Sequence, residues 1–185
     1  LFAAIAAVVH AGDEVIVLDP CYDSYDPAIA LCGGRAVHVP LDATSFLPDW
    51  ERIEAAVTPR TRMILVNTPH NPCGSVFATG DLDALAALAR RHDLFVLSDE
   101  VYEHIVFDDA AHQSVLRHGE LAERSFVVSS FGKTYHCTGW KIGYCIAPRA
   151  LSAEFRKVHQ YLTFCTFTPA QWALAEVLEA DPQHY

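Results

Sequence analysis

The sequence predicts an α/β fold with a mainly parallel sheet flanked by helices. Helical patterns alternate with short apolar runs, and such alternation is typical of parallel strands joined by helical crossovers. The runs are rich in β-branched residues and indicate strands buried on both faces. They occupy residues 14–18, 35–39, 62–66, 94–98, 126–130 and 142–147.

The helical segments have recognisable ends. LFAAIAAVVH opens the chain as a helix already under way and stops near residues 10–12, and SYDPAIALCGG ends on a glycine pair. PDWERIEAAV begins at Pro48 and Asp49. TGDLDALAALARRHD carries acids in its first turn and arginines in its last, which matches the helix dipole, and its apolar residues share one face. TPAQWALAEVLEADPQHY closes the chain with a further helix.

Composition excludes several classes of function. The 185 residues are 51% hydrophobic, which is typical of a globular protein. They carry a formal charge of −10, which argues against a nucleic-acid-binding surface. The opening apolar stretch is too short to cross a bilayer. Six cysteines are scattered singly, without a C-x-x-C pair, which predicts free thiols in a cytoplasmic protein. Neither H-E-x-x-H nor a zinc-like Cys/His spacing occurs, so no metal site is expected.

Polar side chains follow four of the predicted strands. Because parallel strands end at one edge of a sheet, these side chains are expected to share a cleft there. Lys141 follows Lys133 closely and is expected to join them. The residues concerned are Tyr22, Asn71, Asp99, Tyr102, Ser130, Lys133 and Lys141.

Common catalytic and nucleotide motifs are absent. No G-x-G-x-x-G or G-x-S-x-G occurs, and Val127 stands where a phosphate-binding loop ending in Gly132-Lys133 needs its first glycine. A lysine at one strand exit, with an aspartate, a tyrosine and an asparagine at neighbouring exits, indicates a Schiff-base site instead.

Three stretches, NTPHNPCG, SDEVYEH and SSFGKTYHCTGWKIGY, resemble the class I aminotransferases among the fold-type I pyridoxal-phosphate enzymes, in the methionine and kynurenine branch. DPCYDSYDPAIALCGG and HQYLTFCTFTPAQWALAE extend the resemblance over essentially the whole chain. The resemblance implies the cofactor pyridoxal 5′-phosphate and a role for each candidate residue.

Lys133 would form the Schiff base with the cofactor aldehyde and later move the substrate proton. Asp99 would face the pyridine nitrogen, and the alternative is an aspartate that caps a helix in VYEHIVF. Asn71 and Tyr102 would donate hydrogen bonds to the cofactor's phenolate oxygen. Asn71-Pro72 is also an ordinary turn signal, and in this family that peptide bond tends to be cis.

Ser130 and Lys141 would hold the cofactor phosphate, the first by a hydroxyl and the second by a point charge. The alternative for Lys141 is a solvated lysine on an edge strand. Tyr22 would stack against the cofactor ring, or else be a core aromatic.

The resemblance also implies that this chain contains only part of the active site. Residues 1–185 would form the cofactor-binding large domain, truncated at both ends, while the smaller carboxy-terminal domain would follow Tyr185 and supply the arginine for the substrate carboxylate. Such enzymes are homodimers. The fragment alone is therefore expected to be unable to turn over substrate.

The predicted activity is amino-group transfer between an amino acid, with methionine or an aromatic residue favoured, and a 2-oxo acid. The alternative on the same fold is a cysteine-conjugate or cystathionine-type β-lyase. A sensor or transcription factor that borrowed the domain would need a DNA-binding module, and no such segment is visible.

Overall fold

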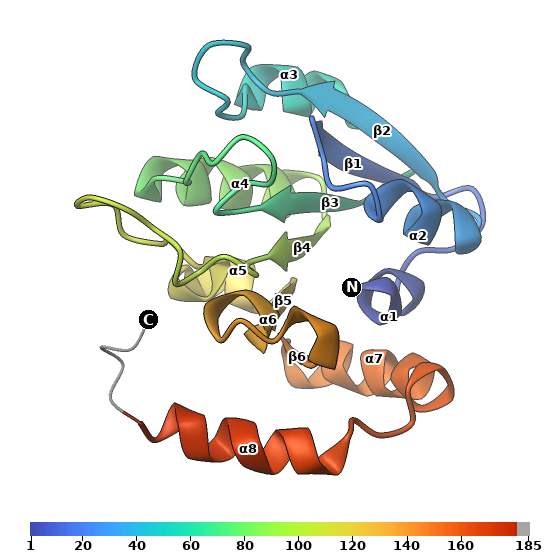
Figure 1. Cartoon of the computed structure of the whole chain (residues 1–185). Helices are drawn as coiled ribbons and strands as arrows, with labels where there is room; N and C mark the ends of the chain where they lie inside the picture. The colour runs from blue at the N-terminus through green and yellow to red at the C-terminus, as the bar shows by residue number, and fades with distance from the viewer. Residues whose placement is uncertain (181–185) are drawn as a thin grey trace.

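A computed structural model describes residues 1–180 and contains a six-stranded sheet with helices on both faces (Figure 1). The strand order across the sheet is β2-β1-β3-β4-β5-β6. In chain order the strands are β1 (Glu14–Asp19), β2 (Arg35–Pro40), β3 (Thr61–Asn67), β4 (Phe95–Asp99), β5 (Ser125–Ser130) and β6 (Gly143–Ile146). All six predicted strands are present, with ends shifted by at most one residue.

The first five strands run parallel, which confirms the predicted fold class. β6 alone is antiparallel, and it pairs with β5 so that Ser130 lies opposite Gly143. The connection between these two strands contains only two single-turn helices and turns back at the same edge of the sheet. The segment just before β6 therefore lies beside the carboxyl ends of the parallel strands.

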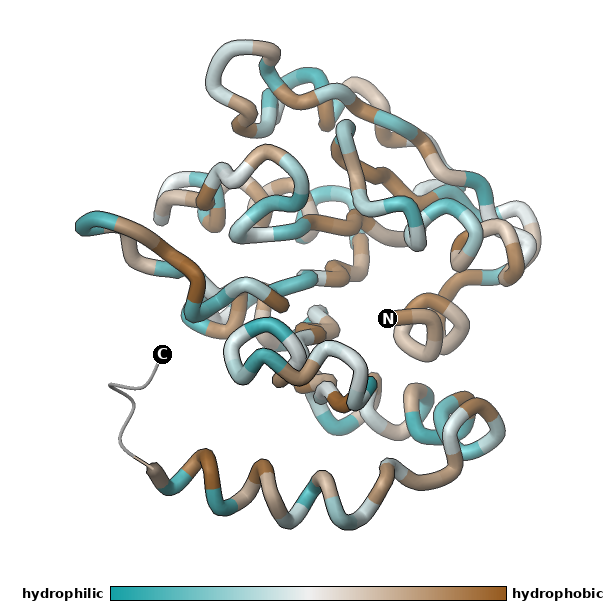
Figure 2. Tube along the Cα trace, viewed as in Figure 1, coloured by the Kyte–Doolittle hydropathy of each residue, from teal (hydrophilic) through white to brown (hydrophobic). Residues whose placement is uncertain are grey.

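Helices cover the two faces of the sheet in separate groups (Figure 1). Alternate residues of β3 show the division: Ile64 and Val66 pack with α3 and α4, whereas Met63 and Leu65 pack with α1, α2 and α7. The hydropathy colouring shows apolar residues along the central strands and α1 (Figure 2). The longer elements are α1 (Phe2–Ala6), α2 (Tyr25–Leu31), α3 (Trp50–Ala55), α4 (Thr79–Arg91), α7 (Arg149–Leu162) and α8 (Thr168–Leu178). The single-turn elements are η1 (Val115–Arg117), α5 (Gly119–Ala122), α6 (Phe131–Thr134) and η2 (Thr138–Trp140).

Two helical expectations need correction. The opening helix ends at Ala6 rather than near residue 10, because the chain turns there toward β1. α7 was not predicted from the sequence, although Leu151 and Phe155 recur at helical spacing and pack on the sheet. The predicted start of the third helix is confirmed, and Asp49 caps it, since its carboxylate accepts a hydrogen bond from the backbone N–H of Arg52.

The closing helix packs against Ile142 through Ala170 and Leu174. Its predicted continuation over residues 181–185 lies outside the described residues. Within residues 1–180 no helix combines the length and the apolar character that crossing a membrane requires.

A buried carboxylate stabilises the start of β1. Glu14 is fully buried and accepts hydrogen bonds from Thr58 Oγ1 at 2.7 Å, from Arg35 at 2.7 Å and from Arg60 Nε at 2.9 Å. These bonds favour the charged form and lower the pKa of Glu14 from 4.5 to about 2. The carboxylate thus links the first residue of β1 to the start of β2 and to the segment just before β3.

Replacing Glu14 with glutamine is expected to destabilise the fold by about 1–3 kcal/mol at neutral pH, because the buried side chain loses its charge-assisted hydrogen bonds. Because the folded-state pKa is lowered, this stabilisation is complete above about pH 4.5 and disappears as the pH falls through about 2. Thermal unfolding of both proteins across this range should show the difference between them shrinking toward acid. A constant difference, or an equal effect of the exposed control Glu176→Gln, would contradict this account.

Candidate functional site

A cavity of about 320 Å³ opens at the carboxyl edge of the central strands. Six of the predicted site residues line it, each delivered by the end of a strand or the segment that follows. The predicted residues in its lining are Tyr22, Asn71, Asp99, Tyr102, Ser130 and Lys133. The common edge of a parallel sheet explains this convergence of residues that lie far apart in the sequence.

Asp99 ends β4 at the floor of the cavity and is 7% exposed. Tyr25 Oη donates a hydrogen bond to Asp99 Oδ2 at 3.0 Å, and the backbone N–H of Val101 donates to Oδ1 at 3.3 Å. Burial raises the pKa of Asp99 because it penalises the charged form, while these two hydrogen bonds act in the opposite direction. No helix follows, since residues 101–104 form a turn, so Asp99 does not cap a helix in VYEHIVF.

Asn67 organises the neighbouring strand exit. Its side-chain Nδ2 donates to the backbone oxygen of Asp99 at 2.8 Å, and its Oδ1 accepts from the backbone N–H of Asn71 at 2.7 Å. The Asn71-Pro72 peptide bond is cis, as the resemblance implied. Asn67 therefore ties the loop that carries Asn71 to the end of β4.

Lys133 lies in α6, directly after β5, and its Nζ is 5.6 Å from the ring centroid of Tyr102. The helix is held against the following segment at Gly132, where an added Cβ would come within 2.9 Å of the Cα of Thr138. Thr138 Oγ1 also donates to the Gly132 carbonyl at 2.9 Å. This close approach leaves room only for glycine at position 132. Lys133, the next residue, lines the cavity and remains exposed.

Tyr22 is 43% exposed and meets Tyr25 edge to face, with ring centroids 5.6 Å apart. It is thus an aromatic at the cavity wall, not a core residue. Tyr25 is the buried member of the pair, and burial together with the Asp99 charge raises the pKa of its hydroxyl far above the usual value. That hydroxyl therefore remains a hydrogen-bond donor to Asp99.

Lys141 does not line the cavity. It is exposed, has the left-handed φ of 56°, and follows η2 just before β6, so it stands at the same edge of the sheet. Its placement agrees with a solvated lysine beside an edge strand. Of the seven residues that were expected to share the cleft, six line the cavity and Lys141 does not.

Sequence reasoning missed several residues of the cavity wall. Tyr25 reads as one more apolar position of a helix, and Asn67 as part of a turn motif, yet both contact Asp99. Ser129 and Thr138 also line the cavity, and no arginine is among its described lining residues. Arg35 and Arg60 bind Glu14, Arg90 binds Glu120, and Arg91 binds Glu54.

Comparisons with known proteins agree on one family. The family model for class I and II aminotransferases matches residues 1–185. A methionine aminotransferase of Escherichia coli is 56% identical over 185 residues, which are 100% of this chain and 48% of that protein. A mouse kynurenine–oxoglutarate transaminase is 37% identical over 196 aligned residues, covering 100% of this chain and 46% of that protein.

Solved structures agree with the fold. The structure of an Escherichia coli protein with methionine aminotransferase function matches with a TM-score of 0.96 at 56% identity, over 100% of this chain and 49% of that one. An N-succinyldiaminopimelate aminotransferase of Mycobacterium tuberculosis matches with a TM-score of 0.93 at 42% identity, over 97% and 47%. The chain thus spans about half the length of the relatives it matches.

Proposed function

Because this chain belongs to the class I and II aminotransferase family, we propose that it forms the cofactor-binding part of an enzyme that transfers an amino group from an amino acid to a 2-oxo acid. The cofactor proposed is pyridoxal 5′-phosphate. One observation carries the proposal: a buried carboxylate, Asp99, and an exposed amine, Lys133, face the same cavity at the carboxyl edge of the sheet.

The chemistry of the wall fits the proposed cofactor. Asp99 forms no salt bridge with a lysine, arginine or histidine among residues 1–180, and burial of such a carboxylate without a cation is unfavourable. A protonated pyridine nitrogen would supply the missing positive charge. Lys133 supplies the amine for covalent attachment of an aldehyde, and 320 Å³ lies within the range of small-ligand cavities.

When bound, pyridoxal phosphate supplies an electron sink for the carbanion formed at the substrate α-carbon. Lys133 would accept the proton at that carbon and return it on the cofactor side, for which its amine must be neutral and close. Asp99 would hold the proton on the ring nitrogen. Asn71 and Tyr102 would donate hydrogen bonds to the phenolate oxygen of the cofactor, with the loop that carries Asn71 held by Asn67.

Ser130 and Lys141 are proposed to bind the phosphate. Ser130 ends β5 and lines the cavity, and Lys141 stands at the same edge two residues before Gly143, which pairs with Ser130. Because Lys141 is exposed at this edge, its side chain could reach a phosphate group that extends out of the cavity.

Replacing Lys141 with alanine is expected to weaken cofactor binding about tenfold, since a charge-assisted hydrogen bond contributes about 1.5–3 kcal/mol and part of this is screened by solvent. Equilibrium dialysis of the full-length apoenzyme with pyridoxal phosphate measures the change. Affinity equal to that of the unchanged enzyme would leave Lys141 as a solvated surface residue.

Replacing Tyr25 with phenylalanine removes the hydrogen bond that favours the Asp99 carboxylate, so the pKa of Asp99 should rise further. Cofactor affinity, which requires the charged form, should then be lost at a higher pH than in the unchanged enzyme. Cofactor titrations of the apoenzyme over a pH series test this. Tyr161→Phe, at an 87% exposed position, is the control. An unshifted midpoint in Tyr25→Phe would contradict the role assigned to this hydroxyl.

We propose methionine or an aromatic amino acid as the donor. A second cavity of about 490 Å³ adjoins the first, since both include Asn71 and Tyr102 in their walls. Its remaining wall is largely apolar and includes Val76, Ile105 and Phe107. An apolar recess beside the reacting centre suits the side chain of such a donor.

The activity is tested by incubating the full-length protein with methionine and a 2-oxo acid, and separately with a cysteine conjugate. We expect the amino acid that corresponds to the oxo acid to form. Pyruvate and ammonia from the conjugate, without amino transfer to any oxo acid, would instead establish the β-lyase, which the named relatives do not favour.

The domain assignment, assembly and location are proposed on the same basis. Residues 1–185 would be the large domain of a homodimeric enzyme, with the substrate-carboxylate arginine elsewhere in the protein. The six free cysteines agree with a reducing cytoplasm. Light scattering of the full-length protein tests the dimer.

A further inference from the structure

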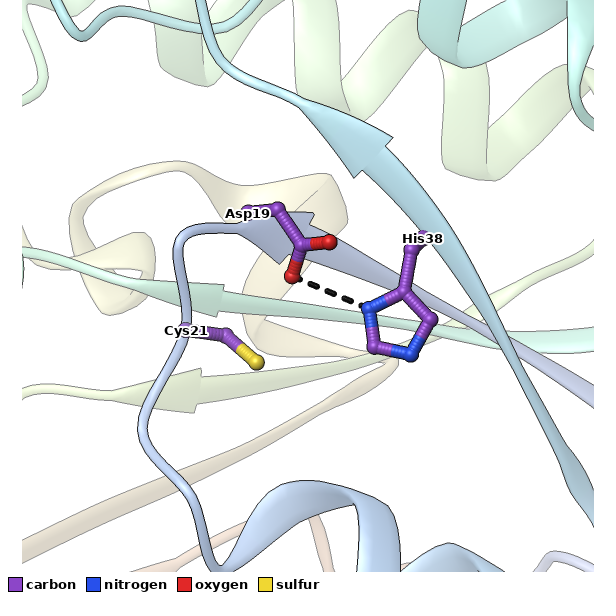
Figure 3. Close-up of side chains that lie close together, drawn as sticks. All are labelled: Asp19, Cys21 and His38. Carbon is purple, nitrogen blue, oxygen red and sulfur yellow. Dashed lines mark hydrogen bonds and ion pairs between the residues drawn. The ribbon is translucent and has the colours of Figure 1, made fainter.

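A second cluster of reactive side chains lies between the ends of β1 and β2 (Figure 3). Asp19 ends β1, Cys21 follows on the next loop, and His38 lies in β2. A carboxylate oxygen, the thiol sulfur and a ring nitrogen from these three residues all lie within 4.8 Å of one another. His38 Nδ1 is 2.9 Å from Asp19 Oδ1.

We propose that Asp19, Cys21 and His38 bind a divalent transition-metal ion of the zinc type. Thiolate, imidazole and carboxylate are the ligands that zinc accepts, and three protein ligands leave a fourth tetrahedral position for water. This mixture of sulfur, nitrogen and oxygen donors disfavours magnesium and calcium, which prefer oxygen alone.

The surroundings of His38 match those of a metal-binding imidazole. While Nδ1 faces the cluster, Nε2 lies 3.1 Å from Asp26 Oδ2, on α2. Ligating histidines usually donate their second ring N–H to such a carboxylate, which fixes the ring orientation. Asp26 would therefore be a positioning residue and not a ligand.

The geometry needs only a small adjustment. Ligand atoms around a tetrahedral zinc ion stand about 3.5 Å apart, which follows from metal–ligand distances near 2.0–2.3 Å. The Asp19–His38 pair, now 2.9 Å apart, must widen slightly, while the three candidate ligand atoms already lie within 4.8 Å of one another. The side chains of Asp19 and His38 are 37% and 38% exposed, so an ion can enter from solvent.

Charge also favours a cation here. The carboxylates of Asp19, Asp23 and Asp26 act electrostatically on Cys21, so the charge around the cluster is negative. A bound cation would displace the thiol proton, as is usual when cysteine ligates a metal. The competing arrangement is a protonated His38 that bridges Asp19 and Asp26, with Cys21 as a bystander.

A bound ion would fasten the loop after β1 to β2. Tyr22 follows Cys21 directly and lines the proposed cofactor cavity. The site would thus fix the position of Tyr22 from outside the cavity. The site is nevertheless separate from the cofactor cavity, because none of the three ligands lines that cavity.

Sequence patterns could not reveal this cluster. Asp19 and Cys21 are near each other in the chain, but His38 joins them only through the pairing of β1 with β2, in which Val17 lies opposite His38. Zinc motifs that are recognised by spacing carry their ligands in closely spaced Cys or His pairs, and neither Cys21 nor His38 has such a partner.

The test uses the full-length protein stripped with a chelator and then dialysed against zinc, with metal counted per chain. We expect one ion per chain at this site, and loss of that ion in Cys21→Ser and in His38→Gln. Cys32→Ser, at another half-buried cysteine, is the matched control and should retain it. Asp26→Asn should weaken binding about 10- to 100-fold.

Cobalt replaces zinc in a second measurement, because a thiolate ligand produces a charge-transfer band. We expect this band in the unchanged protein and in Cys32→Ser, and its loss in Cys21→Ser. The proposal is overturned if zinc is not retained, if the band survives Cys21→Ser, or if Cys32→Ser abolishes it. Retention of the ion in His38→Gln at full affinity would likewise exclude the site.

Discussion

Replacing Lys133 with alanine is expected to abolish covalent attachment of pyridoxal phosphate and to reduce amino transfer by at least about 10²–10⁴-fold. This range is the usual contribution of one positioned proton-transfer group, and the loss of covalent catalysis adds to it. Only an amine can bind the cofactor aldehyde in this way, and Lys133 is the one lysine among the described lining residues of the cavity.

Borohydride reduction of the full-length protein, followed by peptide mapping, locates the attached cofactor. We expect it on Lys133, and no trapped cofactor in Lys133→Ala. Lys157→Ala is the matched control, since Lys157 is exposed on α7 and paired with Glu154. Cofactor trapped on another lysine, or unchanged turnover in Lys133→Ala, would falsify the assignment. Because Lys133 is exposed, the apoenzyme of the variant should unfold at the same temperature as the unchanged apoenzyme.

Asp99→Asn is expected to lower amino transfer by about 10²–10³-fold, the effect typical of removing one preorganised charge-stabilising group. The amide keeps the shape of the side chain but cannot hold a proton on the cofactor nitrogen. The thermal stability of the apoenzyme, in contrast, should not fall. Burial disfavours the Asp99 charge, so the apoenzyme of the variant should be at least as resistant to heat as the unchanged apoenzyme.

Steady-state kinetics and thermal unfolding of the apoenzyme measure the two effects separately. Asp93→Asn is the control, because Asp93 is an exposed aspartate whose left-handed φ of 51° asparagine also adopts readily. If Asp99→Asn lost activity and thermal stability together, the residue would be structural. Near-normal activity in Asp99→Asn would remove it from the proposed cofactor floor.

The strands and most of the cavity wall could be predicted from the residues. A strand buried on both faces must be apolar along its whole length, so runs such as residues 62–66 stand out. The polar residues that follow them, among them Asn71 and Asp99, then have to meet, because parallel strands end at the same edge. The direction of the strands is the one long-range feature on which this convergence depends.

Local patterns failed where packing decides the outcome. Leu151 and Phe155 mark α7 at helical spacing, but the apolar stripe is thin and the polar majority obscured it. The opening helix has apolar residues up to Val9, yet it ends at Ala6 because the following residues turn into β1. Burial in the sheet contact outweighs local helix preference there.

Residue identity and order thus account for the α/β class, the strands and the convergence of Tyr22, Asn71, Asp99, Tyr102 and Lys133. Only the tertiary structure shows that Tyr25 donates to Asp99 and that Lys141 stands outside the cavity wall. The same holds for the meeting of Asp19, Cys21 and His38. These three arrangements depend on how α2 packs on the sheet, on the reversal of β6, and on the β1–β2 register. Each is a contact between segments whose relative placement is set by the burial of other residues, so no local pattern encodes it.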